Sequence, residues 1–165
     1  VGLEASCVVK LRDDGPTLGL GEPVETMGNN ILLFEEFLAR EVMAKRLNLP
    51  LRSMKETETL VHGHCHQKAV GAMKAMRRVL KLIPDHDFSM IEAGCCGMAG
   101  TFGLEAEHVE MASAMAERDL MPALRDKPTA QVIANGFSCR QQMRIHGDTR
   151  PHHLAVLLRD ALAGA

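Results

Sequence analysis

Four of the five cysteines in this chain lie in three short motifs that are suited to metal or redox chemistry. The motifs are His62-Gly63-His64-Cys65-His66, Gly94-Cys95-Cys96-Gly97 and Ser138-Cys139-Arg140. Thiolates bind zinc and iron–sulfur clusters, and four thiols are enough for either. The candidate metal ligands are therefore Cys65, Cys95, Cys96 and Cys139.

The paired cysteines lie in a glycine-rich run over residues 94–103. Adjacent thiols on a turn point in different directions, so both are not expected to be inert core residues. Glycines let a bulky inorganic group approach the main chain and leave N–H groups free to bond its sulfurs. Gly97 is the candidate for such support. The alternative is a tight strand-to-helix turn that carries two core cysteines.

Cys65 is flanked by imidazoles, so it is either a ligand or a thiol whose pKa a protonated neighbour lowers. In an extended chain the three histidines would lie on one face and Cys65 on the other, so all four would not bind one ion. We expect Cys65 to be the ligand and His64 and His66 to support it or carry protons. The alternative, histidines of a solvated loop, fits His62 best.

Cys139 falls at a predicted helix N-terminus, where the helix dipole and free N–H groups stabilise a thiolate. Arg140 follows it and is positioned in sequence to balance the negative charge of a thiolate-bound cluster. Alone the motif is weak, because a buried cysteine that caps a turn is common.

Strand-like runs alternate with helical patterns along most of the chain. The predicted strands cover residues 57–62, 88–93 and 130–134, and the predicted helices 31–45, 67–82, 105–124, 138–146 and 151–162. This alternation predicts the α/β class, as a three-layer, Rossmann-like parallel sheet with helices on both faces. Functional groups gather beyond the carboxyl ends of such strands. Each internal cysteine follows a strand, so we expect the four thiols to converge at that edge.

The amino-terminal region contains a faint repeat. The run from Val1 to Cys7 resembles that from Ile133 to Cys139, since both lead from an apolar strand end into Ser-Cys. We expect residues 1–50 to be the end of a preceding repeat, with an irregular loop over 15–28 and a linking helix that Asn30 caps. Residues 51–165 would then form the complete repeat. Cys7 is an additional ligand or belongs to a second half-site. Coincidence is the alternative. The chain begins without Met or a charged leader, so we expect a piece of a longer protein.

Composition excludes several classes of function. Apolar residues make up 46% and charged residues 24% of the 165 residues, which is ordinary for a globular protein. Nineteen basic and 21 acidic residues give a net charge of −2, and Trp and Tyr are absent, which argues against nucleic-acid binding. No apolar run is long enough to span a membrane. Five cysteines favour reduced thiols in the cytoplasm over a secreted disulfide scaffold.

Together the cysteine motifs resemble the cysteine-rich CCG domain. That domain occurs in heterodisulfide reductase, in glycolate oxidase iron–sulfur subunits and at the C-termini of FAD-linked oxidases. The runs 62–68, 95–100 and 138–140 are most similar to the C-terminal CCG region of FAD-linked D-lactate or D-2-hydroxyglutarate dehydrogenase-like oxidoreductases. The resemblance covers the chain from about Val1 to its end.

The resemblance implies an iron–sulfur cluster, of a non-cubane 4Fe-4S form in heterodisulfide reductase. The family pattern is a lone Cys, a Cys-Cys pair and then Cys-x-x-Cys. Here 29 residues separate Cys65 from Cys95, which fits the pattern, but Gly136 stands where the first Cys of the last pair belongs. One of the family's five thiols is therefore missing, which leaves a cubane cluster or a four-coordinate zinc ion as alternatives.

The resemblance also implies an electron-transfer module of an FAD-linked 2-hydroxy-acid oxidoreductase. FAD-binding and ferredoxin-like domains of the same or a partner chain would be its partners, and the flavin site would lie outside this chain. Peripheral membrane association is compatible with this assignment. The alternatives are cluster-based reduction of a disulfide or quinone and a structural zinc domain that docks the flavin domain.

Overall fold

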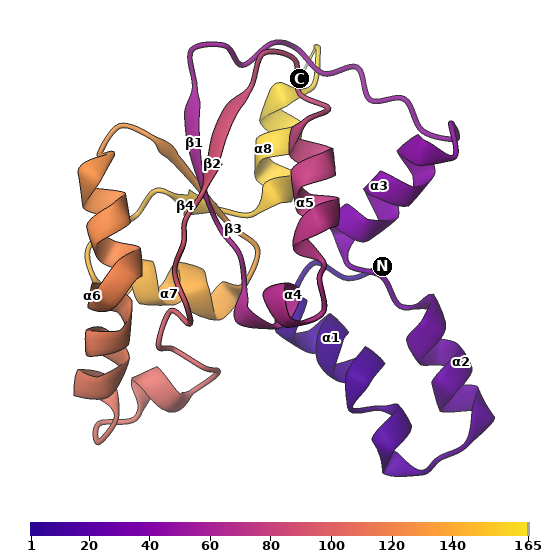
Figure 1. Ribbon diagram of the computed structural model, residues 1–165, viewed down its shortest axis with the longest axis horizontal. Helices are drawn as coiled ribbons and strands as arrows, with labels where there is room; N and C mark the ends of the chain where they lie inside the picture. Colours follow the sequence, from indigo (N-terminus) through magenta and orange to yellow (C-terminus); the bar gives the residue numbers. More distant parts are fainter. Residues whose placement is uncertain (165) are drawn as a thin grey trace.

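Four short parallel strands form the centre of the molecule (Figure 1). The computed structural model describes residues 1–164. The strands are β1 (Glu58–His62), β2 (Asp87–Met90), β3 (Gln131–Ala134) and β4 (Pro151–His152), in the order β2-β1-β3-β4. All three pairings are parallel, and in the central pair His62 lies opposite Ala134. The carboxyl ends of the strands therefore lie at one edge of the sheet, as the alternating pattern predicts.

Helices cover both faces of the sheet. The helices of the structure are α1 (Ala5–Asp13), α2 (Glu22–Asn30), α3 (Phe34–Met43), α4 (Cys65–Ala69), α5 (Met73–Leu80), α6 (Val109–Asp126), α7 (Phe137–Ile145) and α8 (Leu154–Ala161), with the short 3-10 turns η1 (Pro16–Leu18) and η2 (Phe102–Leu104). Side chains alternate along the strands, so Val61 and Ile133 pack with α3, α5 and α8, whereas Leu60 and Val132 pack with α6 and α7. The predicted three-layer α/β class is confirmed.

Three expectations about local structure are wrong. Residues 15–28 are not all irregular, because α2 begins at Glu22, and Asn30 ends α2 rather than capping the next helix. Not every glycine of this segment marks an irregular backbone. Gly19 and Gly21 form a turn with positive φ, whereas Gly28 lies in α2, close to the carbonyl of Arg12. The predicted helix over 67–82 is two helices, since Gly71 (φ +72°) separates α4 from α5.

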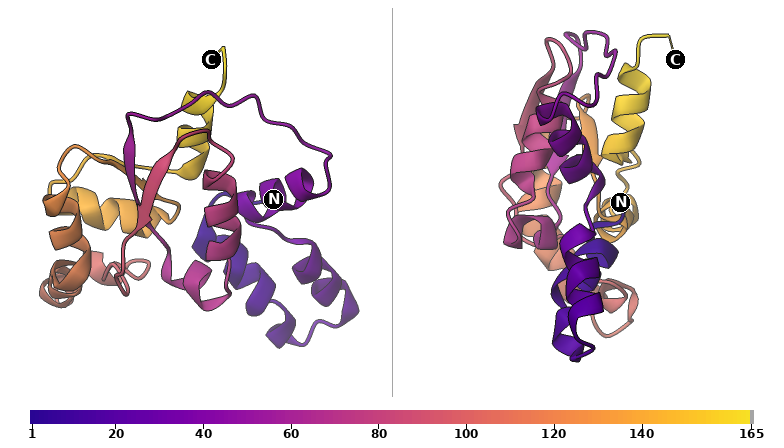
Figure 2. Two further views of the ribbon diagram at one scale, coloured as in Figure 1. Left: turned by 45° about the horizontal axis from the view of Figure 1, so that its top comes forward. Right: turned by 90° about the vertical axis from the view of Figure 1, so that its right-hand side faces the viewer.

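Helices α1 and α2 lie side by side and project from the body of the molecule (Figures 1 and 2). Helices α1 and α7 are each nine residues long, and Ser-Cys occupies the second and third positions of both. Gly2 pairs in parallel with Leu33 just before α3, as β3 pairs with β4 before α8. These parallels support the internal repeat, and the division at residue 50 stays a prediction.

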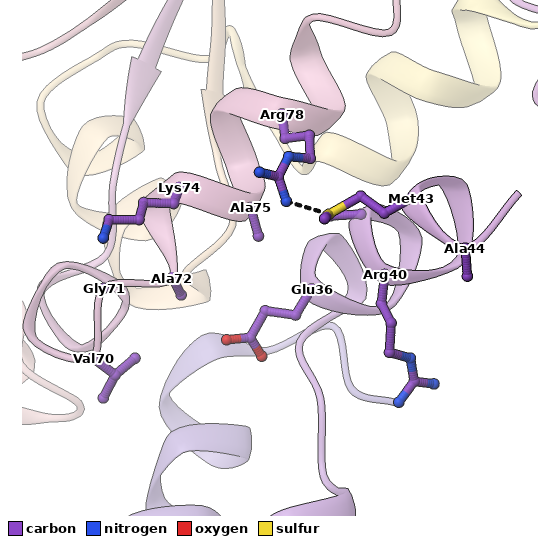
Figure 3. A pocket seen from close by; sticks show the side chains of 11 residues that line it. Glu36, Arg40, Met43, Ala44, Val70, Gly71, Ala72, Lys74, Ala75 and Arg78 are labelled. Carbon is purple, nitrogen blue, oxygen red and sulfur yellow. Dashed lines mark hydrogen bonds between the residues drawn. The ribbon is translucent and has the colours of Figure 1, made fainter.

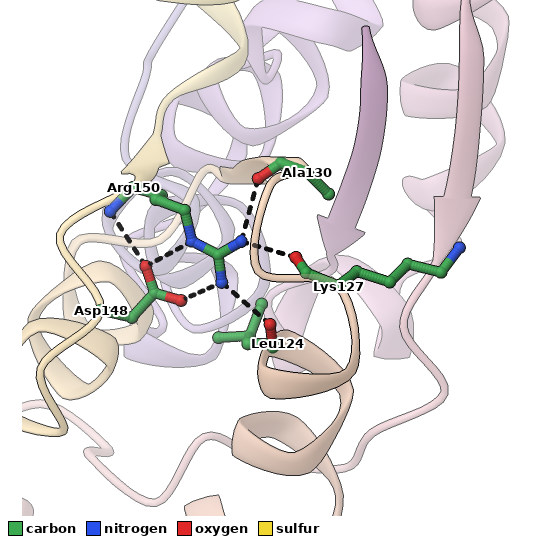
Figure 4. Close-up of polar contacts among 5 residues, drawn as sticks. All are labelled: Leu124, Lys127, Ala130, Asp148 and Arg150. Carbon is green, nitrogen blue, oxygen red and sulfur yellow. Dashed lines mark hydrogen bonds and ion pairs between the residues drawn. The ribbon is translucent and has the colours of Figure 1, made fainter.

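The amino end of β3, opposite the cysteines, is held by Arg150 (Figure 4). Its guanidinium donates to the carbonyls of Leu124, Lys127 and Ala130 at 3.0, 2.7 and 3.1 Å, and it pairs with Asp148 at 2.6 Å. These bonds tie the end of α6 to the turn before β3. None of the helices within residues 1–164 combines the length and the apolar character needed to cross a membrane.

Candidate functional site

The four candidate thiols lie side by side at the carboxyl edge of the sheet. Cys65 opens α4 after β1, Cys95 and Cys96 lie in the loop after β2, and Cys139 is in the first turn of α7 after β3. The thiols form a row in which Cys65 adjoins Cys95, Cys95 adjoins Cys96, and Cys96 adjoins Cys139. The row runs from exposed Cys65 to Cys139, which is buried in the core. That these thiols bind a metal stays a prediction.

Interactions between neighbouring thiols raise the pKa of two of the cysteines and lower the pKa of the other two. The interaction with Cys95, together with burial, raises the pKa of Cys65. Interactions with Cys139 and Cys95, together with burial, raise the pKa of Cys96. Interactions with Cys65 and Cys96 lower the pKa of Cys95. Cys96 likewise lowers the pKa of Cys139, against the effect of burial. The row thus favours two thiolates, the form of cysteine that binds metals.

Gly97 brings the paired-cysteine loop close to α6. Its φ is +90°, and a Cβ at this position would lie 2.2 Å from the carbonyl oxygen of Ala112. The backbone N–H of Gly97 donates to Cys95 Sγ at 3.4 Å. A glycine N–H therefore bonds a sulfur of the row, as the glycine-rich sequence predicts.

The histidines depart from the extended arrangement expected for residues 62–66. His62 and His64 are only 1% and 6% exposed, so the solvated-loop alternative is wrong for both, whereas His66 is exposed. The chain turns into α4 at Cys65 because His64 caps that helix. His64 Nδ1 accepts the backbone N–H of His66 at 3.2 Å. The backbone N–H of His64 in turn donates to Gln67 Oε1 at 3.0 Å. His64 Nδ1 lies 4.0 Å from Cys65 Sγ.

The ring of His64 also lies against Gly136, the position at which the family pattern has its fifth thiol. A Cβ on Gly136 would be 2.3 Å from His64 Cδ2 and 3.2 Å from Cys139 Sγ. Its backbone is ordinary (φ −70°), so the constraint is one of space. The imidazole of His64 occupies the space that a side chain at residue 136 would need.

A buried polar network that the sequence did not reveal joins the first and third cysteine loops. The carboxylate of Glu35, on α3, accepts from the amide of Gln67 and, at 3.1 Å, from that of Asn135. Burial raises the pKa of Glu35. Asn135 Oδ1 in turn accepts the N–H of Leu154 at the start of α8. In sequence Glu35 looks like any acidic residue on an amphipathic helix, so no signal marked it.

Two cations fix the loops further. Lys68 Nζ donates to the carbonyls of Ala93 and Gly94, which joins α4 to the paired-cysteine loop. Arg140 donates to the carbonyls of Ala134 and Asn135 at 2.8 and 2.6 Å, and burial lowers its pKa. Arg140 therefore binds the end of β3, in addition to its charge interaction with Cys139.

Cys7 is exposed on α1, and it is not among the groups that shift the pKa values of the four thiols in the row. Its assignment as an additional ligand or a second half-site stays a prediction. Among residues 1–164, no three His, Cys, Asp or Glu side chains already surround a point where a metal ion would bind. The thiols offer the donor chemistry of a metal site but are arranged as a row.

The largest of the described pockets, about 510 Å³, lies between α3 and α5, away from the cysteines (Figure 3). Arg40, Lys74 and Arg78 contribute positive charge around it, and Glu36 on its wall pairs with Arg12 at 2.9 Å. No cysteine lines this pocket, so it is separate from the candidate site.

Comparison with known proteins shows that the chain is similar to segments of dehydrogenases. It is 30% identical to the D-2-hydroxyglutarate dehydrogenase of Escherichia coli K12 over 160 residues, which cover 96% of this chain and 15% of that protein. The Haemophilus influenzae enzyme of the same name is 36% identical over 152 residues, or 87% of this chain and 14% of the relative. One subunit of the anaerobic glycerol-3-phosphate dehydrogenase of E. coli K12 is 24% identical over 163 residues, which cover 99% of this chain and 40% of that subunit.

The chain thus spans less than half the length of each of these relatives. No family model matches it, and no solved structure matches it. The predicted similarity to D-2-hydroxyglutarate dehydrogenase-like oxidoreductases is confirmed, whereas the CCG assignment itself is matched by no family model. The relatives support a domain that is associated with an oxidoreductase.

Proposed function

We propose that this chain is an electron-transfer segment of a dehydrogenase and that it holds an iron–sulfur cluster on Cys65, Cys95, Cys96 and Cys139. The observation that carries the proposal is the row of thiols, drawn from three loops to one edge of a parallel sheet. Two of the four are favoured as thiolates. A structural cysteine core has no need of stabilised thiolates, whereas cluster ligands must be deprotonated.

The residues around the row fit such a group. An iron–sulfur cluster supplies one-electron transfer, with a potential set by hydrogen bonds to its sulfurs and by burial. Here Gly97 donates an N–H to Cys95, and Cys96 and Cys139 are buried with apolar residues of the α6 and α7 side. Lys68 and Arg140 fix the loops that carry the thiols. Cys65, at the exposed end of the row, is the position from which electrons would enter or leave.

The larger assembly is a proposal of the same kind. The relatives are a D-2-hydroxyglutarate dehydrogenase and one subunit of a glycerol-3-phosphate dehydrogenase, and this chain covers a minor part of each. We propose that a 2-hydroxy acid is oxidised at FAD on another domain of the same or a partner chain. Electrons would then pass through this segment toward an acceptor.

A structural zinc ion is the second candidate, and Gly136 is the observation that favours it. With no fifth thiol, the four cysteines match the tetrahedral Cys₄ set of structural zinc sites. In that case the domain would dock a flavin domain without carrying electrons.

Anaerobic reconstitution with iron and sulfide separates the two candidates. We expect about four iron and four sulfide ions per chain, and an electron paramagnetic resonance signal that changes on reduction with dithionite. Preferential uptake of one zinc ion per chain, with no stable iron–sulfide species, would favour the structural site. A chain that takes up neither metal would contradict the proposed function.

A further inference from the structure

His62 is a buried histidine with no hydrogen-bond partner. It is the last residue of β1 and is 1% exposed, and within the described residues neither Nδ1 nor Nε2 has a partner. Buried polar groups in folded proteins are nearly always bonded, so an unpartnered one calls for an explanation. When both nitrogens of an imidazole are unpartnered, one of them is free to bind a metal ion while the other carries the proton.

The side chain of His62 lies on the same face of the sheet as the buried thiols. Residues two apart on a strand share a face, so His62 lies on the side of Leu60, which packs in one cluster with Cys96 and Cys139. The imidazole of His62 also lies near enough to Cys139 to lower the pKa of that thiol. Its backbone lies opposite Ala134, at the start of the loop that leads to Cys139. The imidazole is therefore at the buried end of the row.

His64 is close to the same thiols but is committed to another role. Its Nδ1 accepts the N–H of His66 in the cap of α4, so in the neutral ring the proton is on Nε2. Neither nitrogen then has a lone pair free for a metal. His64 also fills the space beside Gly136, so no fifth thiol can enter there.

We propose that His62 is a fifth protein ligand to the group held by the four thiols. It would replace the fifth thiol, which Gly136 does not provide. This inference rests on the proposed function. A neutral imidazole in place of a thiolate makes the ligand set less negative by one charge. Histidine ligation raises the reduction potential in Rieske centres, and we expect the same direction here.

The test is pulsed electron paramagnetic resonance on the full chain, grown with ¹⁵N-labelled histidine, reconstituted and reduced. A nitrogen bonded to iron gives a strong hyperfine coupling, which we expect in the wild type. His62→Gln should lose this coupling. His62→Cys should also lose it while retaining iron and sulfide, and should lower the midpoint potential relative to the wild type.

His64→Asn is the matched control, because Asn keeps an acceptor for the cap of α4. It should retain the nitrogen coupling. A reconstituted wild type that carries iron but shows no strong nitrogen coupling would overturn this inference alone. Coupling that survives in His62→Cys but disappears in His64→Asn would overturn it in favour of His64. A wild type that binds no iron would overturn the proposed function and this inference together.

Discussion

Cys65 and Cys95 are neighbours in the row, but the structure gives them opposite acid–base behaviour. The interaction between the two thiols raises the pKa of Cys65 and lowers the pKa of Cys95. Cys65 is also the more exposed of the two. Exposure alone would make Cys65 the more reactive thiol, whereas the pKa shifts favour Cys95. The thiolate is the nucleophile, so we expect the pKa to decide.

In the metal-free chain, iodoacetamide should modify Cys95 before Cys65, although Cys65 is easier to reach. The rate at Cys95 should change little across neutral pH, because a lowered pKa leaves the thiolate already formed. Peptide mapping by mass spectrometry after short exposures measures the order, with exposed Cys7 as the reference for access. Faster modification of Cys65 than of Cys95 would contradict the assignment of protons in the row.

Gly136 and His64 compete for one volume, which makes them a suitable pair for a double-mutant cycle. Gly136→Ala should destabilise the fold by about 1–3 kcal/mol, because its Cβ overlaps the imidazole. In a His64→Ser background, which keeps a capping side chain but removes the ring, the same substitution should cost much less. Urea unfolding of the four proteins measures the coupling, and additive effects would show that the ring does not exclude a side chain at residue 136.

At the scale of elements, the two loops that carry Cys65 and Cys139 meet at the carboxyl of Glu35. Both of its oxygens accept from side-chain amides, Gln67 in α4 and Asn135 after β3. Both side-chain amides donate, so residue 35 must present two acceptor oxygens. Burial makes the ionised form of this carboxyl energetically unfavourable.

Glu35→Gln should therefore lower the free energy of unfolding by about 1–3 kcal/mol, because the new NH₂ group would face the NH₂ group of Gln67 or Asn135. The difference should depend on pH. Burial raises the folded-state pKa of Glu35 above 4.5, so the stabilising contribution of the wild-type carboxyl is complete below 4.5 and is lost as pH rises through the raised value. The penalty of the variant should shrink over that range. Unfolding free energies at a series of pH values measure it, and a constant difference would contradict a buried, titrating Glu35.

The sequence predicted the elements whose apolar pattern is long or bounded by Pro and Gly. Strands β1 to β3 and helix α6 begin and end within four residues of their predicted bounds, and their order puts three cysteine motifs at one edge. Helix α2 was missed because two of its flanking glycines form the turn while Gly28 serves a close helix contact. Strand β4, at two residues, is too short to leave a pattern.

The site was predictable to the level of its thiols but not of its supports. Cysteines are recognisable by type and spacing, whereas Lys68 and Glu35 act through contacts between residues 25 or more positions apart. The burial of His62 follows from its place at the end of a central strand. The sequence placed it in that strand but did not show which elements cover it.

At the scale of the whole molecule, we expect the fold not to depend on a metal in the way a zinc finger does. Two apolar clusters, one on each face of the sheet, are built mostly from strand and helix residues, although Cys96 and Met98 of the paired-cysteine loop belong to one of them. The loops are tied in addition by Lys68 and Arg140. Removing the metal should therefore loosen the cysteine loops without unfolding the sheet.

Hydrogen exchange with and without a chelator tests this expectation. Protection should fall in residues 94–103 and around Cys65 and Cys139, and persist in β1 and β3. Loss of protection throughout the sheet would mean that the metal holds the fold together, and the structural-zinc alternative would then be preferred.

The central claim is that one group is bound by the four thiols of the row, and two matched cysteines test it most directly. Cys7 and Cys139 both occupy the third position of a nine-residue helix after a serine, but only Cys139 belongs to the row. The measurement is bound iron and sulfide per chain after anaerobic reconstitution of Cys139→Ser and Cys7→Ser. We expect Cys7→Ser to retain the wild-type content and Cys139→Ser to lose most of it. Equal loss in both variants, or full retention in Cys139→Ser, would contradict the account.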